Sequence, residues 1–113
     1  MKDVSLIVYA ATDMAAAKPF FRELLGTDPY ADTPHYTGFK SGEVEIGLVP
    51  GGTNAHPGGL AYWTVDDIAS SVKALVAAGG TIVQDISDVA SGLLVASVKD
   101  PNGSIVGLRQ FAK

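Results

Sequence analysis

Hydrophobic positions alternate between helix-type and strand-type spacing along the chain, which predicts two helices among eight short strands. One helix-type pattern runs from Met14 to Leu25, between Asp13 and Gly26. The other follows Asp66-Asp67 and stops at Gly79-Gly80. An acidic residue before the pattern and a glycine after it are typical helix boundaries. Runs rich in apolar and β-branched residues predict strands over residues 4–10, 28–32, 36–41, 44–49, 60–65, 81–86, 93–98 and 104–108.

Pro19 lies inside the first predicted helix. Proline lacks the backbone N–H and crowds the carbonyl four residues earlier. We therefore expect the first turn, residues 14–18, to be loose or kinked, with regular helix continuing from Pro19.

The second half of the chain repeats the plan of the first. Asp13 and Asp67 are 54 residues apart, as are Gly26 and Gly80. Each half ends in a hydrophobic-Gly-Leu strand, 46–48 in the first and 106–108 in the second. The order βαβββ, present twice, predicts an α+β fold of two tandem modules. A ferredoxin-like domain needs the order βαββαβ, which the strand count disfavours.

The length of 113 residues suits one domain. Within it we predict a first module over 1–50, a Gly- and Pro-rich linker over 51–58 and a second module over 59–113. An apolar fraction of 47% and a charged fraction of 18% fit a globular protein.

Charge and cysteine content narrow the function classes. The net charge is −4 and no run of Lys or Arg occurs, so neither nucleic acid nor an anionic membrane is expected as a partner. There is no cysteine, which excludes disulfides and thiolate chemistry. No apolar stretch is long enough to span a membrane, and we see no signal peptide, so a cytoplasmic location is expected.

Four segments carry a resemblance to a known family: 12–13 (Thr-Asp), 20–26 (Phe-Phe-Arg-Glu-Leu-Leu-Gly), 65–68 (Val-Asp-Asp-Ile) and 100–106 (Asp-Pro-Asn-Gly-Ser-Ile-Val). In them the chain resembles the vicinal oxygen chelate superfamily, which includes glyoxalase I, extradiol dioxygenases, methylmalonyl-CoA epimerase and the bleomycin-resistance proteins. The resemblance implies paired βαβββ modules whose curled mixed sheets enclose a cavity. It also implies a homodimer, often with modules paired across chains.

In the metal enzymes of that superfamily, four ligands come from the first and last strands of the two modules. The resemblance places these positions at Leu6, Gly47, Leu60 and Gly107, and none of these side chains can bind a metal. The only two histidines, His35 and His56, stand beside prolines and lack metal-site spacing. We therefore expect a metal-free member with no cofactor.

Alternation along the strands divides side chains between two sheet faces. With the ligand positions facing the cavity, one face carries the candidate ligand-binding residues Leu6, Glu45, Leu60, Tyr62, Thr64 and Arg109, with Val8, Val49 and Ile105. The opposite face is almost wholly apolar and suits helix packing: Ile7, Ile46, Leu48, Trp63, Val65, Val106 and Leu108. A register slip of one residue would exchange Tyr62 and Trp63.

Other readings of these residues stay open. His35 and Tyr36 lie at the start of a predicted strand, near the predicted mouth of the cavity. Three roles are open for them: a lid over the cavity, a general base, or a solvated loop. The sequence fits a solvent-exposed ion pair between Glu45 and Arg109 equally well. Tyr62 equally fits a contact in a dimer interface.

We expect a metal-independent small-molecule binding protein of the antibiotic-resistance type, whose acidic surface favours a cationic aromatic ligand. The alternatives are a lyase, isomerase or dioxygenase with Glu45 or His35 as base, and a non-catalytic scaffold with a collapsed cavity.

Overall fold

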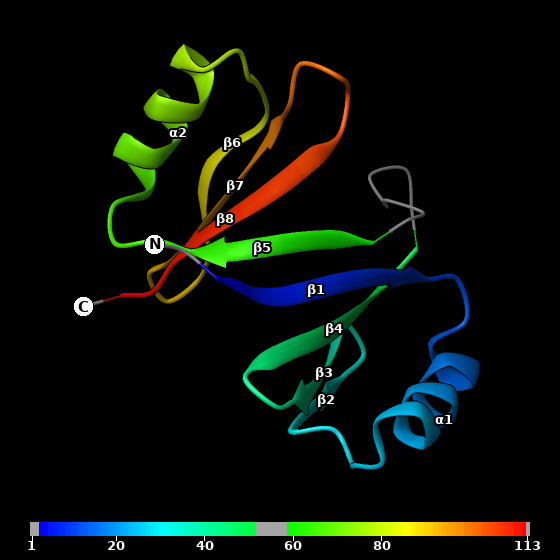
Figure 1. The fold of residues 1–113 in the computed structure, drawn as a ribbon. Coiled ribbons are helices and arrows are strands. Elements are labelled where there is room, and N and C mark those ends of the chain that lie inside the picture. Colours follow the sequence, from blue (N-terminus) through cyan, green and yellow to red (C-terminus); the bar gives the residue numbers. More distant parts are fainter. Residues whose placement is uncertain (1–2, 52–58, 113) are drawn as a thin grey trace. The chain divides into compact units, whose positions relative to one another are not determined.

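The computed structural model describes residues 3–51 and 59–112 (Figure 1). Most of the predicted linker, including His56, lies outside the described residues. The chain divides into two compact units, Ser5–Leu60 (the first unit) and Ala61–Lys113 with Met1–Val4 (the second unit). The fold is α+β and consists of two βαβββ modules, as the repeat predicts.

The strands of the first module follow one another in the order β2-β3-β4-β1 in the eight-stranded mixed sheet. Strand β1 pairs with β4 in parallel, whereas β2, β3 and β4 pair antiparallel. A parallel pair needs a crossover connection, and the helix supplies part of it. The elements are β1 (Val4–Ala11), α1 (Met14–Leu25), β2 (Ala31–Thr33), β3 (Tyr36–Ser41) and β4 (Val44–Pro50).

The second module repeats this arrangement in the order β5-β8-β7-β6. Strand β5 pairs with β8 in parallel, and β6, β7 and β8 pair antiparallel. The elements are β5 (Leu60–Thr64), α2 (Ile68–Ala77), β6 (Thr81–Ala90), β7 (Leu93–Lys99) and β8 (Ile105–Gln110).

The caps predicted from the sequence are present. The side chains of Asp13 and Asp67 accept hydrogen bonds from the N–H groups of Ala16 and Ser70, at 3.0 and 3.1 Å. Gly26 ends α1 in the left-handed conformation, with φ of 68°, which glycine adopts without strain.

The expectation of a loose first turn before Pro19 is wrong. Helix α1 begins at Met14 with Pro19 inside it. The N–H of Ala17 donates to the carbonyl of Asp13 at 3.0 Å, in addition to the Asp13 side-chain cap. These bonds hold the first turn in helical geometry.

Each helix packs on one face of its own sheet and encloses a core there. In the first unit Phe39, Ile46 and Leu48 are buried, and Phe21 and Leu25 of α1 pack against them. In the second unit the buried core comprises Val65, Ile68, Val72, Ala96, Val98 and Leu108. Figure 1 shows α1 and α2 each lying along the sheet of its own module.

Two strands differ from their predicted limits by three residues or more at one end, and the others by at most two residues. Strand β2 covers Ala31–Thr33 instead of 28–32. Strand β6 continues to Ala90, four residues beyond its predicted end, and its pairing with β7 is interrupted by register shifts. Such irregularities let the strand continue where the alternating pattern is lost. No helix in the described portion of the chain is long and apolar enough to cross a membrane.

Candidate functional site

The two predicted sheet faces are present in each unit. Ile7, Ile46 and Leu48 belong to the core beneath α1, and Trp63, Val65, Val106 and Leu108 to the core beneath α2. We call the opposite surface of each sheet the helix-free face. The ring of Tyr62 lies against Gly107 on that face, because a Cβ at Gly107 would meet Tyr62 Cδ2 and Cε2 at 2.6 Å. Tyr62 therefore faces away from the helix and Trp63 toward it, in the register that the sequence favours.

A polar cluster occupies the helix-free face of the first unit. The Tyr30 hydroxyl donates to Glu45 Oε1 over 2.5 Å, and a side-chain hydrogen bond also links Tyr30 with Tyr36. We call these three residues the tyrosine–glutamate cluster. Burial, followed by the hydrogen bonds to Glu45 and Tyr36, raises the pKa of the Tyr30 phenol far above its ordinary value. The hydroxyl therefore keeps its proton and remains a donor to the carboxylate.

Two glycines create the space that the tyrosine rings fill. Gly38 and Gly47 are directly opposite each other on β3 and β4. A Cβ at Gly38 would lie 2.5 Å from Tyr30 Cζ, and one at Gly47 would lie 2.6 Å from Tyr36 Oη. Contacts this short are incompatible with a side chain, so glycine at both positions lets the rings lie directly on the sheet.

A cation already lies near the cluster. Lys40, the cross-strand partner of Glu45, places its Nζ 5.9 Å from the centroid of the Tyr30 ring. This distance is within the range of cation–π attraction. Carboxylate and aromatic rings together make this face attractive to positive charge.

The helix-free face of the second unit carries Tyr62, Thr64 and Arg109. Thr64 and Arg109 are register partners on β5 and β8, and Arg109 Nε donates to Thr64 Oγ1 over 3.1 Å. The guanidinium carbon lies 4.8 Å from the centroid of the Phe111 ring. With 6% exposure, Arg109 is a buried cation held by directed contacts.

The remaining candidates that the structure describes are two buried leucines and one exposed histidine. Leu6 is the register partner of Glu45 on β1 and is buried, and Leu60 is buried at the start of β5. His35 is exposed in the turn between β2 and β3, where its backbone N–H donates to Thr33 Oγ1.

The structure thus brings two sets of predicted residues together: Tyr36 with Glu45 and Leu6, and Tyr62 with Thr64 and Arg109. It also adds Tyr30, which the sequence analysis missed. The pair of facing glycines was the available signal, because a glycine pair leaves a trough that a nearby aromatic ring can fill.

The residues at the superfamily's metal-ligand positions do not fit a metal. Gly47 and Gly107 offer no donor atom, and the rings of Tyr36 and Tyr62 occupy the space where a ligand side chain would project. Leu6 and Leu60 are buried and apolar. Across residues 3–51 and 59–112, no three His, Asp or Glu side chains form a group that could hold an ion.

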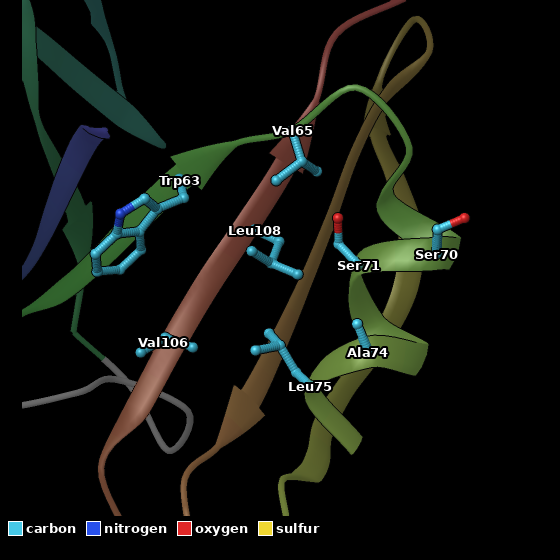
Figure 2. A pocket seen from close by; sticks show the side chains of 8 residues that line it. All are labelled: Trp63, Val65, Ser70, Ser71, Ala74, Leu75, Val106 and Leu108. Carbon is cyan, nitrogen blue, oxygen red and sulfur yellow. The ribbon is translucent and has the colours of Figure 1, made fainter. Parts of the chain in front are cut away.

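An apolar pocket that the sequence did not predict lies on the helix side of the second unit. Its volume is about 520 Å³, and it lies between α2 and the strands β5 and β8 (Figure 2). The described lining is apolar apart from two serine hydroxyls and comprises Trp63, Val65, Ser70, Ser71, Ala74, Leu75, Val106 and Leu108.

Comparison with known proteins identifies the family of this chain. Residues 4–108 match the family model of the Glyoxalase/Bleomycin resistance protein/Dioxygenase superfamily. The comparison with curated proteins found no significant match.

Solved structures share the fold at low identity. A hypothetical protein of Bacillus halodurans C-125 has a TM-score of 0.80 at 16% identity, with 99% of this chain and 96% of that chain covered. Methylmalonyl-CoA epimerase of Mycobacterium tuberculosis has a TM-score of 0.78 at 13% identity, covering 97% and 88%. A structure described as NAD-dependent benzaldehyde dehydrogenase of Legionella pneumophila has a TM-score of 0.76 at 16% identity, covering 95% and 98%.

Proposed function

Because the chain belongs to the Glyoxalase/Bleomycin resistance protein/Dioxygenase superfamily, we propose that it binds a cationic aromatic small molecule on its helix-free face, without a metal. One observation supports this proposal above the others. At the two last-strand positions where metal enzymes of the superfamily carry ligands, this chain has glycines covered by tyrosine rings. The surface there offers aromatic area for stacking in place of donor atoms for an ion.

The tyrosine–glutamate cluster supplies the preference for positive charge. Glu45 brings a carboxylate, and Tyr30 and Tyr36 bring aromatic rings whose faces attract cations. The hydrogen bond from Tyr30 orients the carboxylate before any ligand arrives, which lowers the ordering cost of binding. In this function the protein sequesters its ligand and leaves it chemically unchanged.

Isothermal titration calorimetry tests the proposal with benzyltrimethylammonium and its neutral carbon isostere, 2,2-dimethylpropylbenzene. We expect the wild-type protein to bind the cation at least about tenfold more tightly than the isostere, since cation–π and carboxylate contacts act on charge. Glu45→Gln should remove most of this preference. Glu43→Gln is the matched control, because Glu43 is exposed in the β3–β4 turn and its loss changes the net charge equally.

Three outcomes would contradict the proposal. One is absence of binding across a panel of such cations, and another is an equal loss of affinity in Glu43→Gln and Glu45→Gln. The third is turnover of a hemithioacetal or catechol substrate that disappears in Glu45→Gln, because it would support the enzyme alternative.

A further inference from the structure

The space between helix and sheet is filled differently in the two modules. In the first module, the ring of Phe21 on α1 lies 5.4 Å from the ring of Tyr9 on β1, measured between centroids. The ring of Phe20 lies 5.4 Å from that of Phe21, and Phe20 is 64% exposed. Three aromatic rings therefore continue from the sheet to the outer surface of the helix, and the first module fills this space with its own side chains.

The repeat identifies the residues at the same places in the second module. Equivalent positions are 54 residues apart, as the N-caps Asp13 and Asp67 show. By this spacing, the counterparts of Tyr9, Phe20 and Phe21 are Trp63, Ala74 and Leu75. The strand therefore keeps an aromatic ring, whereas α2 carries a methyl and an isobutyl group where α1 carries two rings. All three counterparts line the apolar pocket of about 520 Å³.

This pocket, which we call the α2 pocket, has the chemistry of a site for an uncharged molecule. Figure 2 shows Trp63 at one side of it and Ala74 and Leu75 at the other. Its described lining carries no charged group, so an ionised ligand would lose hydration there without gaining a partner. The polar side chains of this lining are those of Ser70 and Ser71 on α2. Small-molecule sites of comparable volume combine apolar and aromatic walls with a few polar groups.

We infer that the α2 pocket binds a neutral small molecule that carries two aromatic rings and a hydroxyl or carbonyl group. The two rings replace those that Phe20 and Phe21 provide in the first module, and they pack against Trp63. Burial of the ring surface supplies the affinity, and the hydroxyl of half-buried Ser71 can hydrogen-bond the ligand oxygen. This inference goes beyond the proposed function, because the ligand is uncharged and the site lies on the helix side of the second unit.

Fluorescence titration with diphenylmethanol tests the inference. This probe has two phenyl rings and one hydroxyl, and it does not absorb at the red edge of the tryptophan band. Trp63 is the only tryptophan in the sequence, so emission excited at that edge reports on this pocket. We expect saturable binding, with the emission shifted to shorter wavelength as the rings displace water from the half-buried indole. Diphenylmethylammonium, with an ammonium group in place of the hydroxyl, should bind at least about tenfold more weakly, although the net charge of −4 favours cations.

Filling the pocket with a protein side chain makes the test specific. Ala74→Phe and Leu75→Phe each restore one ring of the first module, and each should weaken diphenylmethanol binding at least about tenfold. Ala69→Phe is the matched control, because Ala69 is exposed on the same helix and lies outside the lining. Circular dichroism and thermal melting show whether the three variants are folded. Nuclear Overhauser effects between the phenyl protons of the probe and the methyl groups of Leu75 and Val106 locate the probe in the wild-type protein without any variant.

Several results would overturn the inference. They are the absence of saturable binding up to the solubility limit of diphenylmethanol, equal affinities for the alcohol and the ammonium ion, and an equal loss of affinity in Ala69→Phe and Ala74→Phe. If the pocket-filling variants unfold, absence of Overhauser effects from the bound probe to the pocket methyl groups would do the same. Each of these outcomes concerns the second unit alone, so it leaves the proposed cation site at Glu45 unaffected.

Discussion

Adding one methyl group at Gly47 tests whether the Tyr36 ring lies where the structure puts it. In Gly47→Ala the new Cβ would lie 2.6 Å from Tyr36 Oη and 2.8 Å from Tyr36 Cε1, whereas ordinary contacts begin near 3.4 Å. The ring must therefore move away from the sheet. Overpacking of this kind costs ~1–3 kcal/mol, and because Tyr36 is partly exposed we expect a loss of about 1 kcal/mol in unfolding free energy.

A double-mutant cycle isolates this contact. In a Tyr36→Ala background the obstacle is gone, so Gly47→Ala should be neutral or stabilise by ~0.5 kcal/mol through the unfolded chain. Urea denaturation followed by circular dichroism measures all four proteins. Gly107→Ala serves as control, because its new Cβ meets Tyr62 and its cost should be unchanged by Tyr36→Ala.

An equal cost of Gly47→Ala with and without the Tyr36 ring would refute this reasoning. The space above Gly47 would then be free of the ring. The absence of a metal-ligand donor at this position would remain, but the stacking surface proposed for the ligand would lose its basis.

Three further predictions concern stability. Because the pKa of Tyr30 is raised, the stability from its protonated form is present below pH 10.0, the ordinary phenol value, and is lost as pH rises above it. Between about pH 9 and pH 11, the unfolding free energy from urea titrations should therefore fall less in Tyr30→Phe than in wild type. An equal fall in both proteins would contradict the raised pKa of Tyr30. Arg109→Ala should cost about 3 kcal/mol by removing a buried side chain and its bond to Thr64, with Arg109→Lys intermediate; a melting temperature equal to wild type would exclude this role. Asp67→Ala should cost about 1 kcal/mol through the lost α2 cap, whereas Asp66→Ala should change stability by less than about 0.5 kcal/mol, both measured by thermal unfolding.

Local signals in the sequence located most of the fold. Helix limits follow from Asp13, Gly26 and Asp67, because caps act within a few residues of the chain. Strand alternation also divided the strand residues between two faces, since a two-residue period leaves only two choices, whereas the structure decided which of Tyr62 and Trp63 faces the helix. The sequence misplaced strand ends where pairing between strands outweighs local composition. In β6, irregular pairing with β7 extends the strand to Ala90.

The first-turn error at Pro19 has a similar physical origin. The sequence shows the missing N–H of proline but not the compensation around it. The carbonyl and the carboxylate of Asp13 both accept bonds from the first turn, and the apolar face of α1 packs on the core. Packing of this kind outweighs an unfavourable local preference.

The sequence by itself determined which residue types occupy each sheet face, and its resemblance to the superfamily implies leucine and glycine at the metal-ligand positions. Only the tertiary structure decided what fills the space left by those glycines. Tyr30 reaches Glu45 across 15 residues, and Tyr62 reaches Gly107 through the pairing of β5 with β8. Local pattern has a range of a few residues, whereas these contacts depend on strand register and on the direction in which each ring lies over a neighbouring strand.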